Sequence, residues 1–276
     1  MTKNPPPARN ASYLEISENP PSANTASELE ISDNPLSAED KSRKLFEAAK
    51  EGDVEKVNVL VSTQNVDYTH NDSFWGPTTP LFIACKEGHI DVAKALIAKG
   101  ADLNLANQYG GATPLLIACK EGHIDVAKAL IAGGADLDLA ESGFKATPLI
   151  MACSKGHVEI VIALIDKGAN LEKADYFGNA PLYVACKNGH TASAEALLKA
   201  GANTDCLREE GILYGYQNTI RSDFKNASEE MKNLIKTFID PKKNINGDES
   251  LERRPSSEVA TSIVQEIEDG LRRNAR

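Results

Sequence analysis

The chain lacks the features that usually mark a nucleic-acid-binding, membrane or secreted protein. Its 276 residues carry 30 Lys and Arg against 40 Asp and Glu, a formal net charge of −10, so there is no basic surplus for the phosphates of nucleic acid or anionic lipid. No apolar run approaches the roughly 18 residues of a membrane span, and the N-terminus lacks the apolar stretch of a secretory signal. We therefore expect a soluble protein of the cytoplasm or nucleus.

Sequence motifs of catalysis and metal binding are also missing. The chain has no Gly-rich phosphate loop, no His-Glu-x-x-His and no Cys-x-x-Cys, and the pair Asp136-x-Asp138 lacks the further acidic position and the Gly of a calcium loop. We therefore expect no enzyme activity, no cofactor, no metal ion and no small-molecule substrate.

What the chain does have is an internal repeat. The segment Ile83–Ala106 recurs as Ile117–Ala140 with changes at only two positions, Lys99/Gly133 and Asn104/Asp138. Further copies begin at intervals of 34, 34 and 33 residues, and a period of this length is typical of a stacked repeat array. The four starts are Thr79-Pro80-Leu81, Thr113-Pro114-Leu115, Thr147-Pro148-Leu149 and Ala180-Pro181-Leu182.

The chemistry of one unit predicts two helices and a turn. The hydroxyl of Thr79 is suited to cap a helix, and Pro80 fits the first helical position, where a missing N–H breaks no hydrogen bond. Gly88 ends this helix, and apolar residues then follow at helical spacing until Gly100. One such unit is too small to be stable alone, so stability has to come from the interfaces between neighbouring units.

The unit resembles the ankyrin repeat, whose signature is a Thr-Pro-Leu helix start, a Gly-His turn, a second helix and a Gly-Ala-Asp lead into a hairpin. The resemblance covers about 43 to 207 and implies an all-α solenoid of helix-turn-helix units with hairpin fingers. The chain departs from the signature after Thr-Pro-Leu, where the usual His is replaced in every unit. The substitutes are Phe82, Leu116, Ile150 and Tyr183.

We predict four segments: a disordered acidic tail (1–40), the solenoid (41–240), a linker (241–255) and an amphipathic helix or disordered tail (256–276). The solenoid should hold about six units, with degenerate units at both ends acting as polar caps. The last of these has a capping-box pattern at Asn226 and Glu229, an apolar face from Met231 to Ile239, and Pro241 after its helix.

The segments outside the solenoid leave several alternatives open. The tail contains a short duplication, Ala11–Pro20 against Ala26–Pro35, whose Leu-Glu-Ile steps are either docking motifs or filler. The C-terminal helix could pack on the solenoid, pair with a partner helix or fold only on binding. Ser256, which follows Arg253-Arg254-Pro255, resembles a site for basic-directed kinases.

Repeat spacing also decides how the cysteines and histidines are interpreted. Four cysteines (Cys85, Cys119, Cys153, Cys186) and four Gly-His histidines recur once per unit. Stacked helices lie about 8 to 10 Å apart, too far for a disulfide or for convergence on one metal ion. We predict that the thiols are small core residues, and the resemblance implies that each histidine ties the turn to backbone groups. A thiol-based redox sensor or enzyme remains a weak alternative.

The solenoid predicts a non-catalytic adaptor, scaffold or inhibitor that binds a partner protein. The resemblance implies two contact surfaces, the finger tips and the inner helix. We expect a monomer that binds neither nucleic acid nor membrane. The alternatives are a structural tether whose tails carry the interactions, tip aromatics that pack on neighbouring fingers, and inner-helix charges that form only a solvated face. The candidate residues are Phe74, Trp75, Tyr109, Phe144, Tyr176 and Phe177 at the tips, and Lys86, Glu87, Lys120, Glu121, Ser154, Lys155, Lys187 and Asn188 on the inner helices.

Overall fold

The computed structural model describes residues 36–72, 75–207 and 227–239, and every structural statement below concerns these residues. They form helices joined by short loops, with one two-stranded antiparallel hairpin. In chain order the elements are α1 (Ala38–Glu51), α2 (Val54–Leu60), β1 (His70–Asp72), β2 (Gly76–Thr78), α3 (Pro80–Glu87), α4 (Ile90–Ala98), α5 (Pro114–Glu121), α6 (Ile124–Ala132), α7 (Pro148–Lys155), α8 (Val158–Asp166), α9 (Pro181–Lys187), α10 (Thr191–Lys199), the 3₁₀ turn η1 (Asp205–Leu207) and α12 (Glu229–Ile239).

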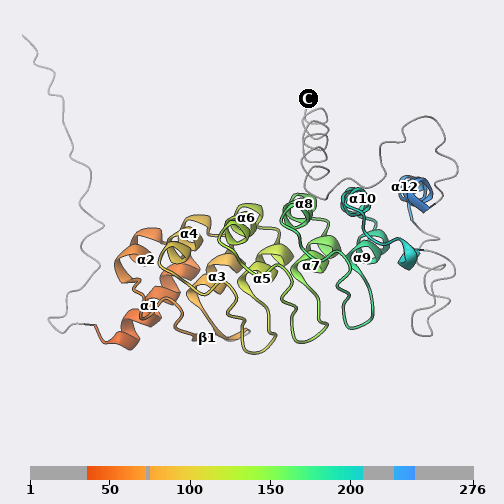
Figure 1. Cartoon of the computed structure of the whole chain (residues 1–276). Coiled ribbons are helices and arrows are strands. Elements are labelled where there is room, and N and C mark those ends of the chain that lie inside the picture. Colours follow the sequence, from red (N-terminus) through yellow and green to blue (C-terminus); the bar gives the residue numbers. More distant parts are fainter. Residues whose placement is uncertain (1–35, 73–74, 208–226, 240–276) are drawn as a thin grey trace, which may run out of the picture. The chain divides into compact units, whose positions relative to one another are not determined.

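The helices form two layers, and a loop projects before each inner helix from α3 to α9 (Figure 1). The inner helices α1, α3, α5, α7 and α9 contact one another in succession, as do the outer helices α2, α4, α6, α8 and α10. Each inner helix also packs on the outer helix of its own unit. The predicted solenoid of two-helix units is therefore confirmed.

Local sequence defines where each inner helix begins and ends. Thr79 is extended, and its Oγ1 accepts a hydrogen bond from the N–H of Phe82 at 3.1 Å, while Pro80 takes the first helical position. Thr113 and Thr147 cap α5 and α7 in the same way. Gly88 ends α3 in the left-handed conformation, with φ 82°. The predicted cap and stop are thus confirmed.

The inner helices form the core of the solenoid. In α3, every side chain from Leu81 to Cys85 is at most 1% exposed, because the helix is enclosed by the inner helices on both sides, the outer helix of its unit and the adjoining loops. A helix that is apolar all round is stable only when it is covered all round. The apolar residues of all units accordingly join one continuous cluster from Leu45 to Met231.

A ladder of hydrogen bonds also joins successive units along the loops after the outer helices. In each case a backbone N–H of one unit donates to a side-chain oxygen of the unit before it. These bonds give a partner to loop N–H groups that have none within a helix. The donor and acceptor pairs are Asp102 to Asp67 (2.9 Å), Asp136 to Asn104 (2.9 Å), Asn170 to Asp138 (3.0 Å) and Asn203 to Glu172 (2.7 Å).

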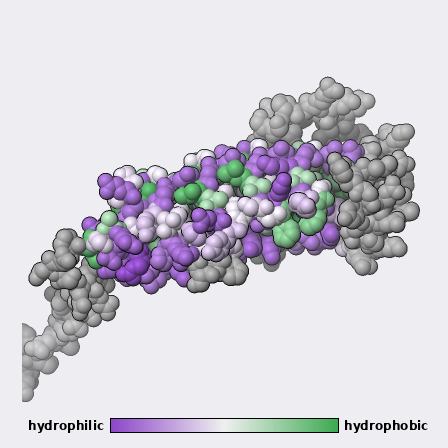
Figure 2. Space-filling view, turned by 90° about the horizontal axis from the view of Figure 1, so that it is seen from below, coloured by the Kyte–Doolittle hydropathy of each residue, from purple (hydrophilic) through white to green (hydrophobic). Residues whose placement is uncertain are grey.

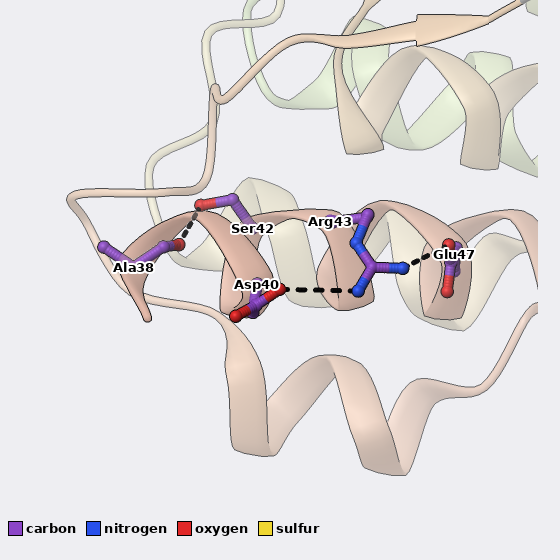
Figure 3. Close-up of polar contacts among 5 residues, drawn as sticks. All are labelled: Ala38, Asp40, Ser42, Arg43 and Glu47. Carbon is purple, nitrogen blue, oxygen red and sulfur yellow. Dashed lines mark hydrogen bonds and ion pairs between the residues drawn. The ribbon is translucent and has the colours of Figure 1, made fainter. Parts of the chain in front are cut away.

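The N-terminal unit has a polar outer surface. On α1, Arg43 lies between two carboxylates, 3.4 Å from Asp40 Oδ1 and 3.6 Å from Glu47 Oε1, while the Ser42 hydroxyl donates to the Ala38 carbonyl (Figure 3). Such exposed ion pairs add little to the stability of the fold, but their charges keep the surface of the first unit hydrated. The helix begins at Ala38, three residues inside the range assigned to the tail, and its first turn holds acidic residues that favour a helix start.

The opposite end is covered by η1, which contacts α9, and by α12, which contacts α10. Met231 of α12 is fully buried. The Ser228 hydroxyl caps α12 by accepting the Met231 N–H at 3.1 Å, whereas Asn226, the predicted cap residue, lies outside the described residues. The predicted disordered tail, linker and C-terminal helix lie outside the described residues, apart from 36–40.

Candidate protein-binding surface

The four loops that precede α3, α5, α7 and α9 form a row of fingers, which we number 1 (70–78), 2 (104–112), 3 (138–146) and 4 (172–180). Finger 1 is a hairpin in which His70 pairs with Thr78. Each later finger donates one backbone N–H to the finger before it: Gln108 to Pro77 (3.2 Å), Ser142 to Gly110 (2.9 Å) and Tyr176 to Phe144 (2.6 Å). These bonds keep the fingers in register, so the tip side chains are held at fixed positions.

The buried side chain of Asn107 stabilises finger 2 and joins it to finger 1. Its Oδ1 accepts the N–H of Ala112 at 2.6 Å, and its Nδ2 donates to the Trp75 carbonyl at 3.0 Å. A buried amide that is hydrogen-bonded at both its oxygen and its nitrogen holds the loop in one conformation.

The described aromatic residues of the first two fingers differ in burial. Trp75 is half-buried, with its ring 5.8 Å from the Phe82 ring and 5.1 Å from the Lys120 Nζ. The Tyr109 ring covers Gly76, where a Cβ would come within 2.8 Å of it. Trp75 therefore packs on its neighbours, the alternative left open by the sequence, whereas Tyr109 touches finger 1 on one side and is still 69% exposed. Phe74 lies outside the described residues.

In fingers 3 and 4, exposed aromatic side chains contact one another on the surface. Phe144, Tyr176 and Phe177 are 61%, 68% and 65% exposed. The Phe177 ring lies 5.9 Å from that of Phe144 and 5.6 Å from that of Tyr176. We call these three residues the aromatic patch. Figure 2 views the face that carries the finger tips and shows apolar surface gathered toward the end at which fingers 3 and 4 lie.

Two residues that the sequence did not single out extend the apolar surface onto the inner helices. Met151 of α7 and Val184 of α9 are half-buried, whereas Ile83 of α3 and Ile117 of α5, at the matching positions, are at most 1% exposed. The sequence does carry a sign of this difference, because Ile at this repeat position is replaced by Met151 and Val184 in the last two units. The difference in burial, however, depends on how neighbouring loops cover each helix.

The structure brings the predicted inner-helix residues together in one row, at the C-terminal ends of α3, α5, α7 and α9. Lys86 pairs with Glu87, Lys120 lies over Trp75, and Lys187 lies over the Tyr183 ring at 5.7 Å. Glu87, Glu121, Lys155, Lys187 and Asn188 are exposed, while Lys86, Lys120 and Ser154 are half-buried.

The Gly-His histidines stabilise the stack. The Nε2 of His123 lies 2.9 Å from the Lys86 carbonyl oxygen of the preceding unit, and His89 and His190 make matching contacts with Lys50 and Ser154. Each ring also covers the glycine that ends the preceding inner helix: a Cβ on Gly88 would come within 2.6 Å of His123. This contact agrees with the tie between turn and backbone that the resemblance implied.

The ladder cysteines are core residues, each at most 2% exposed. Burial raises the pKa of the Cys186 thiol to about 12 and that of the half-buried Cys206 to about 11. Burial likewise raises the pKa of Cys85, Cys119 and Cys153. Since the thiolate is the reactive form, the raised pKa values lower the reactivity of these thiols at neutral pH, most of all for the buried ladder cysteines.

Within the described ranges, no group of His, Cys, Asp and Glu side chains is arranged to hold a metal ion. The same ranges contain no helix long and apolar enough to cross a membrane.

Comparison with known proteins shows two similarities. The family model for ankyrin repeats in three copies matches residues 45–141 and 134–207. Protein phosphatase 1 regulatory subunit 27 from Mus musculus is 39% identical over 66 residues, and its Homo sapiens counterpart is 38% identical over the same length. Each match covers 24% of this chain and 41% of the relative, so the chain spans about two fifths of the length of these curated relatives.

Proposed function

Because the chain belongs to the ankyrin repeat family, a family of protein-interaction modules, we propose that it is a non-catalytic protein that binds a partner protein through the aromatic patch and the inner-helix row. The observation that carries this proposal is the aromatic patch. Three exposed aromatic rings in mutual contact, on loops held in register, are typical of interface anchors. Rigid loops lose little entropy on binding, so the energy of their contacts is available for affinity.

We propose fewer contact residues than the sequence predicted. Trp75 is half-buried against Phe82 of α3, so its replacement would damage the scaffold as well as any interface. We assign the partner contacts to fingers 3 and 4, where exposed aromatic rings contact one another, with Lys155, Lys187 and Asn188 as the exposed members of the inner-helix row in the same two units.

The proposal is tested by capture of proteins from cell extract with the intact chain and with a variant in which Phe144, Tyr176 and Phe177 are all changed to Ser. A matched control changes Val59, which is 79% exposed on α2, to Ser. We expect the patch variant to lose specifically captured proteins and the control to retain them, with both variants keeping the circular dichroism and melting temperature of the intact chain. Capture of the same proteins by all three would refute the proposal and favour a structural tether.

The name of the relatives supplies one candidate partner, protein phosphatase 1. Isothermal titration of the purified phosphatase into the intact chain, the patch variant and the Val59 control tests it. Binding that requires the aromatic patch would support this partner. Without binding, the phosphatase is removed as a candidate, while the capture experiment still tests the binding role itself.

A further inference from the structure

Elsewhere in the solenoid, aromatic rings hold a lysine over one face. The Nζ of Lys120 lies 5.1 Å from the centroid of the Trp75 ring, and the Nζ of Lys187 lies 5.7 Å from that of Tyr183. Both distances are within the roughly 6 Å at which the negative face of an aromatic ring attracts a cation. The rings of the aromatic patch, in contrast, have no lysine or arginine of the described residues over them. Their exposed faces are therefore available to a cation of the partner.

The two fingers that carry the patch are also negatively charged. They contain four acidic residues and two lysines, a net charge of −2, whereas finger 2 contains no charged residue. The acidic residues are Asp138, Glu141, Glu172 and Asp175, and the lysines are Lys145 and Lys173.

Asp175 brings one of these negative charges to the patch itself. Its Oδ1 accepts the N–H of Phe177 at 2.9 Å and that of Asn179 at 2.8 Å, so the carboxylate lies against the backbone of a patch residue. The Phe177 ring is the one that contacts both Phe144 and Tyr176. A cation resting on these rings is attracted by their faces and by the carboxylate together.

The lysines of the inner-helix row do not cancel this charge, because they lie at the other end of their helices. Finger 3 ends where α7 begins, at Pro148, and Lys155 is the last residue of that helix. Seven steps of 1.5 Å separate the two residues by about 10 Å along the helix axis. Lys187 has the same place in α9, and its Nζ lies over the Tyr183 ring.

This combination of rings and charge distinguishes between the side chains that a partner could offer. An acidic side chain is repelled by the finger carboxylates, and an aliphatic one gains from the rings but not from the charge. Arginine gains from both, because its guanidinium group is planar, stacks on aromatic faces and is less strongly hydrated than the ammonium group of lysine.

We propose that the aromatic patch binds an arginine of the partner protein, held in a segment with apolar side chains on either side. The guanidinium group lies over the patch rings, within reach of the negative charge of fingers 3 and 4, and the flanking apolar side chains cover the ring edges. This inference rests on the proposed function, since it names the chemistry of the partner at the same patch.

The test uses end-blocked peptides of the sequence Gly-Ser-Leu-Xaa-Leu-Ser-Gly, in which Xaa is arginine, citrulline, leucine or glutamate. Citrulline is the matched control, because it keeps the shape of arginine without its charge. Each peptide is titrated into the ¹⁵N-labelled full chain, and the NMR signals of the Phe144, Tyr176 and Phe177 amides report binding. We expect the arginine peptide to bind about tenfold more tightly than the citrulline peptide, about fivefold from the rings and about twofold from the charges. The glutamate peptide should bind most weakly, and high salt should reduce the preference for arginine.

Two charge variants with opposite expected effects test the contribution of the fingers. E141Q/D175N removes two carboxylates and should weaken the arginine peptide about two- to fourfold, while K145Q/K173Q removes two lysines and should strengthen it by a similar factor. The change at Asp175 keeps a side-chain acceptor, since Asn107 has the corresponding place in finger 2 and accepts the Ala112 N–H there. Binding of the citrulline peptide should be the same in both variants, and unchanged circular dichroism and melting temperature show that the fingers remain folded.

The inference is overturned if arginine and citrulline peptides bind equally, if the glutamate peptide binds most tightly, or if no peptide moves the patch signals up to its solubility limit. This failure is distinct from failure of the proposed function. If the variant with all three patch residues changed to Ser loses its captured proteins while arginine shows no advantage, only the preference for arginine is refuted. If that variant keeps its captured proteins while arginine binds tenfold better to the intact chain, the partner-binding role is refuted and the arginine site stands.

Discussion

Replacing Gly88 by alanine tests the contact that we hold responsible for joining the units. Gly88 has φ 82°, and a Cβ there would come within 2.6 Å of the His123 ring of the next unit. That ring also places Nε2 at 2.9 Å from the Lys86 carbonyl oxygen. Alanine therefore has to adopt a left-handed conformation and at the same time displace the ring from its hydrogen bond.

Gly100, in the same unit, is the matched control. Its φ is 84°, and nothing lies within 4 Å of a Cβ built there. The left-handed conformation costs about 1–2 kcal/mol, partly offset by the smaller entropy of the unfolded chain, so Gly100→Ala should destabilise by about 1 kcal/mol. Gly88→Ala should destabilise by about 2–3 kcal/mol, because overpacking and the lost hydrogen bond add about 1–2 kcal/mol.

The assay is urea unfolding followed by circular dichroism, repeated in a His123→Ala background. Without the ring, Gly88→Ala and Gly100→Ala should cost the same, since only the left-handed conformation then opposes each alanine. If both alanines lower the free energy of unfolding equally in the chain that retains His123, the ring contact has no such role. The same holds if Gly88→Ala remains more destabilising than Gly100→Ala in the His123→Ala background.

Three further predictions concern departures from the repeat pattern. Ala180 precedes α9 and provides no side-chain cap. Ala180→Thr should supply the hydrogen bond that Thr147 makes in α7 and raise the free energy of unfolding, measured by urea titration, by about 1 kcal/mol. An unchanged free energy of unfolding would show that a cap at this helix does not stabilise the chain. Asp166 lies at the C-terminal end of α8, where burial raises its pKa above the ordinary value of 3.8 and the helix carbonyls also oppose a negative charge. The preceding unit has Ala132 at this position. Asp166→Ala should therefore stabilise the fold by about 0.3–1 kcal/mol at pH 7. The ionised form is the destabilising one, so this advantage should shrink as the pH falls through the native pKa toward 3.8, and a pH-independent difference would contradict the assignment. Alkylation of the native chain should label Cys206 first and the ladder cysteines only on unfolding, with Cys206→Ser removing the early reaction; fast labelling of the ladder would revive a redox role.

The sequence alone predicted the repeat architecture because every determinant of a unit is local. Thr79, Pro80 and Gly88 act on the backbone within four residues of themselves, and the interval of 34 residues implies stacking without any knowledge of the contacts. Local sequence was not enough to identify the residue that caps α12 in the irregular last unit. There, Asn226 and Ser228 both suit a helix start, and the hydrogen bond to Met231 selects Ser228.

The candidate surface was decided by the tertiary structure. From the sequence, Trp75, Tyr109 and Phe144 were alike as aromatic residues of successive fingers. Burial depends on what a neighbouring unit places against each ring: Phe82 and Lys120 cover Trp75, and Tyr109 lies over Gly76. Trp75 is half-buried, whereas Tyr109 stays 69% exposed; Phe144 and Phe177 lie against one another and remain 61% and 65% exposed. Periodicity specifies which residues recur, but exposure is a property of pairs of units, and only the packed structure determines it.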